Sequence, residues 1–384
     1  MTVLRRGDER VSPLELFFDL VFVLAITQCT ALMAAQPTWA GLTRGLLVLA
    51  VLWWAWVGYA WLTSVIDPEE DAVRLAVFAA MAGFLIVSLC VPEAFGDLGL
   101  VFAVAYAVVR SGQIVLFVLA SPDDPQLRRS VVGLAVSTAI AVSLLVVASF
   151  LDGVAQGACW ALAILLDFGG PLVFGADGWK LVPGHFAERH GLIIIIALGE
   201  SIVAIGVGAG SVAIDGGVIA VATLGVFLAA ALWWAYFDVV AVAAERRLSQ
   251  AAVGREQNAM ARDGYSLLHL PMVAGIVLVA LGLKKVIAHE TDPLPIEIAT
   301  ALCGGVALYL LAHVAFRWRV THTVNRERLG VAVVLAAVIP LGTVLAAWAT
   351  LLVVTVITAA LIGYETTAWA ETRDRIRHRG SSGE

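Results

Sequence analysis

Apolar runs of about twenty residues recur along the whole chain, and they constrain its fold more than any other feature. Each run is long enough to cross a lipid bilayer as a helix. Of the 384 residues, 61% are hydrophobic and only 14% are charged, whereas soluble domains carry about 25% charged residues. So few charges cannot cover an exterior that faces water. The sequence therefore predicts an all-α, polytopic membrane helix bundle whose main partner is the lipid bilayer.

The runs predict about twelve transmembrane helices. Their approximate limits are 12–35, 42–65, 72–92, 98–120, 130–151, 155–175, 186–210, 216–242, 264–287, 295–318, 328–345 and 348–369. Only the turn residues around 339–342 separate the last two runs, so one long kinked helix is the alternative. The count would then be eleven.

The distribution of basic residues favours twelve helices. Most of the 24 Lys and Arg residues fall in the N-terminal segment, in alternate connections and in the C-terminal tail. Basic residues of membrane proteins stay on the cytoplasmic side. The pattern predicts that both termini are cytoplasmic, because an odd number of spans would place the Arg-rich tail outside.

Three sequence markers occur in the same order in the two halves of the chain. They are Trp53-Trp54 and Trp233-Trp234, the segments beginning at Met81 and Met272, and the basic groups Arg128-Arg129 and Arg326–Arg328. This order predicts two parallel six-helix repeats, over 1–180 and 181–370, followed by a disordered cytoplasmic tail over 371–384. Because six is even, both repeats enter the membrane from the same side and are related by an axis along its normal.

Other classes of protein find little support in the sequence. The Lys/Arg-rich patch that nucleic-acid binding needs is absent, and neither HExxH nor a Cys/His metal spacing nor GxxxxGK[ST] occurs. We therefore expect no metal, no cofactor and no nucleic acid. The four cysteines lie in or beside apolar runs and are expected to be core residues. The sequence does not decide whether the chain forms a homo-oligomer.

Charged residues inside apolar runs are the candidates for function, because insertion of a charge into hydrocarbon is unfavourable and such residues usually face the bundle interior. Glu15 and Asp19 lie four apart near the start of the first run, so they share a helical face. That face continues to Phe22 and Ile26, as an acidic entrance to an ion or proton path would. Alternatively, both carboxylates pair with interfacial Arg residues and fix the depth of the helix.

A second group lies at the start of the seventh run. His185, Glu188 and Arg189 have i, i+3 and i+4 spacing and can touch, either as a functional group or as an ion-pair cluster that caps the helix. Glu200 and Ser201 follow, with Glu200 about 18 Å beyond Glu188 along the helix. A carboxylate at that depth is expected to be protonated or paired. Glu200 either takes part in transport or forms an interhelical hydrogen bond without a role in transport.

The ninth run carries a third group. Arg262, Ser266 and His269 are expected to share one helical face, and Tyr265 and His269 form an i, i+4 pair. Because His titrates near neutral pH, His269 is a candidate proton relay or pH sensor, and a packed hydrogen-bonding residue is the alternative. Pro271 is expected to free a backbone carbonyl near His269.

Three further observations complete the candidates. Asp238 and Asp167 are lesser candidates, each expected to pair with Arg110, a cytoplasmic Arg or His313. His185, Glu188, Glu200 and His269 would form a metal site only if tertiary contacts assembled them. The glycines of 206–210 end an apolar run without a following Lys, which indicates close helix packing rather than a phosphate loop.

Three segments resemble the bacterial low temperature requirement A (LtrA) family. They are ELFFDLVFVLAITQ (15–28), ERHGLIIIIALGESI (188–202) and YSLLHLPMVAGIVLVALGL (265–283). The resemblance implies a multi-pass protein of the bacterial cytoplasmic (inner) membrane and does not imply a mechanism. Phe18-Asp19 and the following residues are also similar to the motif that opens the first helix of lysosomal and bacterial potassium channels. Phe18 replaces the Ser of that motif, which argues against a potassium-specific function.

Three functions follow from these patterns. The first is a channel or secondary transporter for protons, cations or a small solute, which the intramembrane acids and His residues favour. The second is a membrane-embedded enzyme acting on a lipid or apolar substrate, with Glu200 or Glu188 as general acid or base and His269 assisting. The third is a structural cold-adaptation protein whose polar groups only hold helices together.

Overall fold

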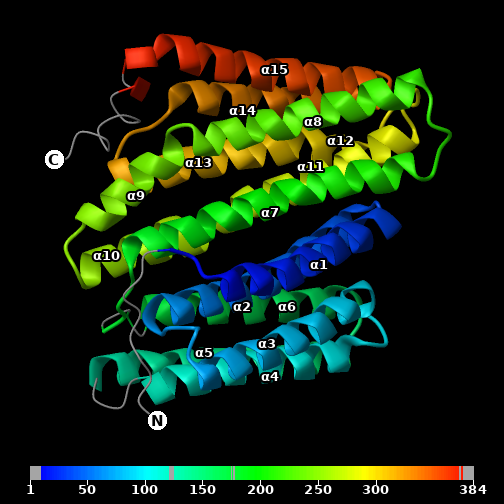
Figure 1. Ribbon diagram of the computed structural model, residues 1–384. Coiled ribbons are helices and arrows are strands. Elements are labelled where there is room, and N and C mark those ends of the chain that lie inside the picture. The colour runs from blue at the N-terminus through cyan, green and yellow to red at the C-terminus, as the bar shows by residue number, and fades with distance from the viewer. Residues whose placement is uncertain (1–9, 121–124, 174, 176–177, 372, 375–384) are drawn as a thin grey trace. The chain divides into compact units, whose positions relative to one another are not determined.

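The computed structural model describes residues 10–371, 373 and 374, apart from 121–124, 174, 176 and 177 (Figure 1). Helices account for most of the described residues, as predicted. Within the described residues, eleven helices are long and apolar enough to cross a membrane. The polytopic helical fold is therefore confirmed. The predicted tail over 371–384 falls mostly outside the described residues.

The first helix begins at Ser12-Pro13, where the predicted run 12–35 starts. In α1 (Pro13–Ala35), Ser12 Oγ accepts a hydrogen bond from the Glu15 N–H, and Glu15 Oε2 accepts one from the Ser12 N–H at 2.9 Å. This reciprocal capping box satisfies two backbone donors that have no partner within the helix. Pro13 occupies the first helical position, where its fixed φ suits the helix. The cap therefore fixes the Glu15 carboxylate at the start of α1.

The chain divides into two compact units. The first comprises the chain up to Gln36, Ala40–Arg189 and Ala251–Arg262. Its helices after α1 are α2 (Trp39–Val65), α3 (Asp71–Cys90), α4 (Gly99–Ala120), α5 (Pro125–Ala148), α6 (Gly153–Val173), the start of α7 (Pro183–Ala209) and α10 (Arg255–Met260). Neighbouring helices pack in sequence, α3 with α4, α4 with α5 and α5 with α6, and α1 packs on α3.

Aromatic side chains fill the core of this first unit. Phe18 of α1 lies 5.0 Å from Tyr59 of α2 and 5.2 Å from Phe84 of α3, measured between ring centroids. Phe22, one turn further along α1, contacts Trp56 and Phe84. The face that continues from Glu15 and Asp19 thus runs into packed rings.

The second unit comprises Pro37–Trp39, His190–Gln250 and the chain from Asp263 onward. After α7 its helices are α8 (Gly216–Phe237), α9 (Val240–Gln250), α11 (His269–Ala288), α12 (Ile296–Ala299), α13 (Gly305–Thr321), α14 (Arg326–Val338) and α15 (Ala347–Ala368). Two π-helical segments, Ala261–Leu267 and Thr300–Gly304, lead into α11 and α13. In this unit α14 and α15 lie side by side, and α15 also packs on α8 (Figure 1).

The structure decides between the two predictions for the end of the chain. α14 and α15 are separate helices, so the single kinked helix is wrong. Pro340 has no N–H to continue an α-helix, and the chain forms the 3₁₀ segment η4 (Ile339–Thr343). The Leu294 N–H donates to the Gly342 carbonyl at 2.9 Å, which anchors this turn. α14 has only 13 residues, which is why the predicted span 328–345 is not among the eleven helices above, whereas α15 is.

The two-repeat organisation remains a prediction. The matched Trp pairs have different surroundings: Trp53 and Trp54 are buried in α2, whereas Trp233 and Trp234 in α8 are 44% and 39% exposed. The shared order of the markers therefore does not correspond to a shared environment at this position.

Two glycines let α11 and α13 approach closely, and we predict that both are required. A Cβ at Gly275 would lie 2.6 Å from the Gly305 carbonyl oxygen, and a Cβ at Gly305 would lie 2.7 Å from the Gly275 carbonyl oxygen. Backbone atoms cannot move aside as a flexible side chain can. Gly275→Ala and Gly305→Ala should each lower the free energy of unfolding by about 1–3 kcal/mol, measured by thermal unfolding in detergent.

Gly330→Ala in α14 is the matched control, because a Cβ there meets no atom within 4 Å. It should leave stability unchanged or raise it slightly, since Ala is the better helix former. Equal effects of the three substitutions would contradict the role of the glycines in this crossing.

Candidate functional site: a buried network between α1 and α7

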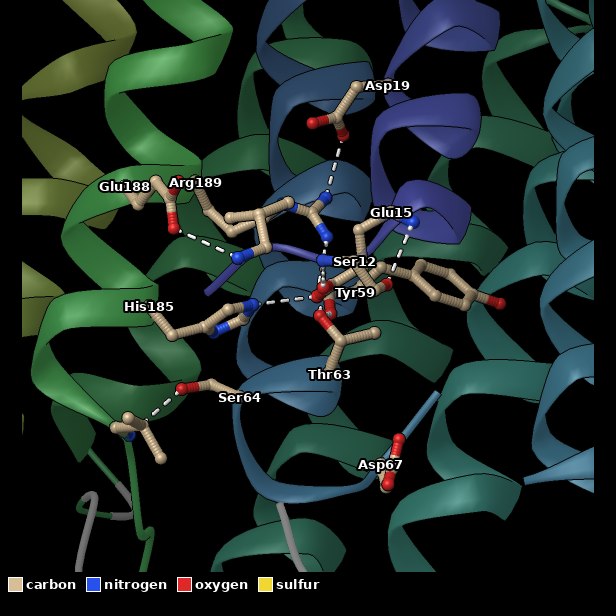
Figure 2. A network of polar contacts seen from close by, with 12 residues as sticks. Ser12, Glu15, Asp19, Tyr59, Thr63, Ser64, Asp67, His185, Glu188 and Arg189 are labelled. Carbon is tan, nitrogen blue, oxygen red and sulfur yellow. Dashed lines mark hydrogen bonds and ion pairs between the residues drawn. The ribbon is translucent and has the colours of Figure 1, made fainter. Parts of the chain in front are cut away.

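The strongest candidate site joins the start of α1 to the start of α7 within the first unit (Figure 2). Arg189 donates from Nη1 to Glu15 Oε1 at 3.0 Å and from Nη2 to Asp19 Oδ1 at 2.7 Å. His185 Nε2 lies 2.9 Å from the same Glu15 oxygen. Four of the predicted site residues thus converge, although some 170 positions separate the two pairs in sequence.

Helix geometry explains why these residues fit together. Glu15 and Asp19 are four apart on α1, and His185 and Arg189 are four apart on α7, so each pair occupies one face of its helix. The two terminal NH2 groups of the Arg189 guanidinium, Nη1 and Nη2, therefore reach two carboxylates that lie one turn apart. This alternative, carboxylates paired with Arg, was one of the two that the sequence left open for Glu15 and Asp19.

The side chains of the network are almost completely buried. At most 1% of each of the four side chains is exposed. Trp56 Nε1 donates to Asp19 Oδ1 at 2.8 Å, and its ring lies 5.6 Å from the Arg189 guanidinium carbon. Thr63 Oγ1 accepts a third, longer hydrogen bond of Arg189, from Nη1 at 3.4 Å. Buried charges need such partners, because the loss of hydration is otherwise uncompensated.

The contact between His185 and Glu15 defines where a proton can sit. An ionised carboxylate oxygen only accepts hydrogen bonds, so at this distance Nε2 of the imidazole carries the hydrogen. With His185 neutral, the four side chains together carry one net negative charge. When His185 is protonated, their charges balance. The arrangement can therefore take up one additional proton, on Nδ1 of His185, while Nε2 keeps its hydrogen bond to Glu15.

Glu188 turns away from these four residues. Its Oε2 accepts a hydrogen bond from the Val11 N–H at 2.9 Å, just before the cap of α1. The predicted contact of His185, Glu188 and Arg189 with one another is thus replaced by separate contacts of each with the start of α1. Glu188 fixes the chain that enters α1, and the other two bind its carboxylates.

The candidates around His269 lie in the second unit. Tyr265 stacks on His269 with ring centroids 5.2 Å apart, which confirms the predicted i, i+4 contact. The His269 Nδ1 group donates to the Gly264 carbonyl at 3.1 Å, because a carbonyl oxygen can only accept. In a neutral imidazole Nε2 is then an acceptor, and it lies 2.8 Å from the Tyr236 hydroxyl. His190 completes this aromatic group, 5.2 Å from His269 between ring centroids.

The prediction that Arg262, Ser266 and His269 share one α-helical face is wrong. Residues Ala261–Leu267 form a π-helix, whose hydrogen bonds span five residues instead of four and change the register. Arg262 belongs to the first unit, where it donates to the Pro171 carbonyl at 3.3 Å. Ser266 is buried in the second unit with His269. Pro271 is expected to free a backbone carbonyl near His269. The carbonyl that His269 contacts is that of Gly264, which lies in the π-helix just before Pro271.

Glu200 and Ser201 are both buried on the part of α7 that belongs to the second unit. Ser201 Oγ makes no hydrogen bond with the described residues. Glu200 is thus a buried acid on an apolar helix, in a different unit from Glu15 and Asp19, and its depth in the membrane stays a prediction.

The two lesser candidates are both paired with arginine. Asp167 Oδ2 lies 3.3 Å from Arg110 Nη2, and Thr138 and Ser137 donate to Asp167 Oδ1. Asp238 lies 2.7 Å from Arg373. Each pairing agrees with one of the predicted partners. These pairs contain one acid and one base each, so their charges balance without a titrating histidine.

Sequence reasoning missed Trp56 and Thr63 in the first group and Tyr236 in the second. These residues lie on α2 and α8, where aromatic and small polar residues in an apolar run read as ordinary core positions. Within the described ranges, no three His, Cys, Asp or Glu side chains gather as a metal site would require.

The comparisons with known proteins agree with this architecture. The family described as "Bacterial low temperature requirement A protein (LtrA)" matches residues 10–363. The chain belongs to the LtrA family. A curated relative from Rhizobium meliloti (strain 1021), named "Uncharacterized protein RA0937", is 28% identical over 306 residues, which cover 77% of this chain and 74% of the relative. No solved structure matches the chain.

The match spans both LtrA segments that carry the network, around α1 and α7. Family membership and the eleven apolar helices together establish a multi-pass membrane protein. The side of the membrane on which the termini lie stays a prediction.

Removal of Arg189 should strongly destabilise this LtrA protein. Arg189→Met leaves two carboxylates buried beside each other, and loss of one partner of a buried ion pair costs about 3–5 kcal/mol. The triple variant Glu15→Gln, Asp19→Asn, Arg189→Met removes all three charges and should recover most of that loss. Thermal unfolding of the purified protein measures both effects.

Arg74→Met serves as the control, because its pair with Glu69 is 40% and 49% exposed. Exposed pairs contribute about 1 kcal/mol at most, so this variant should unfold close to the parent. If Arg189→Met also behaved like the parent, the buried network would have no part in holding α1 to α7.

Proposed function

We propose that this LtrA protein is a proton-linked channel or secondary transporter for a small cation or solute, located in the bacterial inner membrane with both termini cytoplasmic. We propose further that the Glu15–Asp19–His185–Arg189 network is its proton-binding element. The observation that carries the proposal is the buried 2.9 Å contact between the His185 imidazole and the Glu15 carboxylate beside Arg189.

Burial makes the protonation state of this network consequential. Ionisable residues inside a membrane are energetically unfavourable, and they characteristically belong to proton and ion pathways. A change of one charge among His185, Glu15, Asp19 and Arg189 alters the attraction between the starts of α1 and α7. Proton binding would therefore change how firmly these two helix ends hold each other, which is what coupling to a transport step requires.

The other charged and polar groups near the network support this assignment. Tyr59 donates to the Val109 carbonyl at 2.9 Å, and Glu188 accepts from the Val11 backbone. Both have partners of their own, outside the carboxylates that Arg189 bridges. Proton exchange is therefore assigned to the His185–Glu15 contact, with Asp19 and Arg189 setting its electrostatic surroundings.

Proton flux into liposomes tests the proposal. The purified full-length protein is reconstituted with a pH-sensitive dye inside, and flux is followed under an imposed membrane potential. The parent should carry protons faster than empty liposomes do, and Glu15→Gln should reduce the rate to the level of empty liposomes. His185→Gln should do the same, because it removes the titrating partner.

Asp71→Asn is the matched control, since that carboxylate is 98% exposed at the start of α3. It should retain the flux of the parent. A parent protein with no flux above empty liposomes, tested across protons and a panel of monovalent cations, would overturn the proposal. Altered membrane lipids in a deletion strain would then favour the enzymatic alternative.

A further inference from the structure

A cavity of about 310 Å³ lies within the second unit, apart from the network described above. It is lined by the end of α8, α9, α13, the start of α14 and the end of α15. This volume lies in the range of small-molecule sites. Apolar side chains form much of the wall, among them Trp234, Ala243, Phe316, Val320 and Ile362.

One residue that lines the cavity has a buried polar atom without a partner. His313 lines the cavity and is 1% exposed. Its Nδ1 group donates to the Tyr309 carbonyl at 2.8 Å, so Nε2 of the neutral ring is a hydrogen-bond acceptor. Nε2 makes no hydrogen bond with any described residue. A buried acceptor without a partner is unfavourable, and a ligand group that donates a hydrogen bond would satisfy it.

The charges that line the cavity leave one cation in excess. Arg328 makes two hydrogen bonds to the Glu365 carboxylate, at 2.9 and 2.8 Å, and Arg373 pairs with Asp238 at 2.7 Å. Within each pair the positive and the negative charge cancel. Arg317 also lines the cavity, and its Nε group donates to a neutral acceptor, the Thr323 hydroxyl, at 2.9 Å. Among the described residues it makes no ion pair.

The positions of His313 and Arg317 specify the shape of a ligand. They are four apart on α13, so they lie on one face about one helical turn, or ~6 Å, from each other. His313 is at the buried end and Arg317 is exposed. A ligand would place an anionic group on Arg317 and a hydrogen-bond donor on His313, with an apolar part against the Trp, Phe, Val and Ile side chains.

We propose that this cavity binds an amphipathic phosphate ester that carries a hydroxyl close to its phosphate. Arg317 binds the phosphate, His313 Nε2 accepts a hydrogen bond from the hydroxyl, and the apolar wall contacts the chain. A glycerophospholipid headgroup and a soluble phosphate ester share this chemistry. The apolar wall favours the lipid.

Ligand-induced stabilisation of the full-length protein in detergent tests the site. The probes are short-chain phosphatidylglycerol, phosphatidylcholine with the same chains, and glycerol 3-phosphate. Phosphatidylglycerol should raise the melting temperature saturably, and phosphatidylcholine, which has no headgroup hydroxyl and no net charge, should not. A comparable effect of glycerol 3-phosphate would assign the site to soluble esters; no effect would assign it to the lipid.

Three variants separate this site from general attraction to basic residues. Arg317→Gln should weaken phosphatidylglycerol binding about fivefold at low salt, as expected for a charge at an exposed rim. Ala243→Trp fills the cavity and should abolish saturable binding, as should His313→Phe. Arg326→Gln is the control, because Arg326 is exposed and does not line the cavity; it should bind as the parent does.

The test does not depend on His313→Phe, because substitution of a buried residue can prevent folding. Equal stabilisation by phosphatidylglycerol and phosphatidylcholine would overturn the proposal. So would equal affinity of the parent, Arg317→Gln and Ala243→Trp, because binding would then occur elsewhere on the protein.

Discussion

The guanidinium of Arg189, held between two carboxylates one helical turn apart, is the interaction on which the first unit depends. It places two acids and one base out of reach of water. Such a group is stable only while every member keeps its partners. The capping box at Ser12, the indole of Trp56 and the hydroxyl of Thr63 add further hydrogen bonds, whereas Asp19 Oδ2 and Arg189 Nε make none with the described residues. The geometry of α1 and the start of α7 follows from this requirement.

The same arrangement leaves the network one proton short of charge balance when His185 is neutral. This distinguishes it from the Arg110–Asp167 pair in the same unit, where one acid meets one base and the Thr138 hydroxyl forms hydrogen bonds with both. We regard the Arg110–Asp167 pair as structural. The network around Arg189 combines burial with a histidine, His185, and this combination is the basis of the functional proposal for this LtrA protein.

The sequence predicted the members of the network but not their pairing. Glu15, Asp19, His185 and Arg189 stood out because charges are rare in apolar runs, and their i, i+4 spacing placed each pair on one face. No local spacing records that α1 meets α7, so the contact over some 170 positions came only from the structure. Trp56 was missed because an indole N–H that caps a carboxylate resembles an ordinary core residue.

Where local geometry departed from the α-helix, prediction failed. The π-helix at Ala261–Leu267 changes the register between Arg262 and His269, and the apolar pattern around it is compatible with either helix type. The sequence also did not predict the cavity beside His313. Its lining comes from five segments, and the significance of His313 rests on a tautomer that the Tyr309 carbonyl selects.

Infrared difference spectra of the reconstituted protein, recorded between alkaline and acidic pH, test the central claim most directly. The account predicts that acidification protonates the His185–Glu15 contact. Imidazole and carboxyl bands should therefore change in the parent and in Asp71→Asn, and the same bands should be missing from Glu15→Gln and His185→Gln. Identical difference spectra for the parent and these two network variants would contradict it, because the buried group would then hold a fixed charge and exchange no proton.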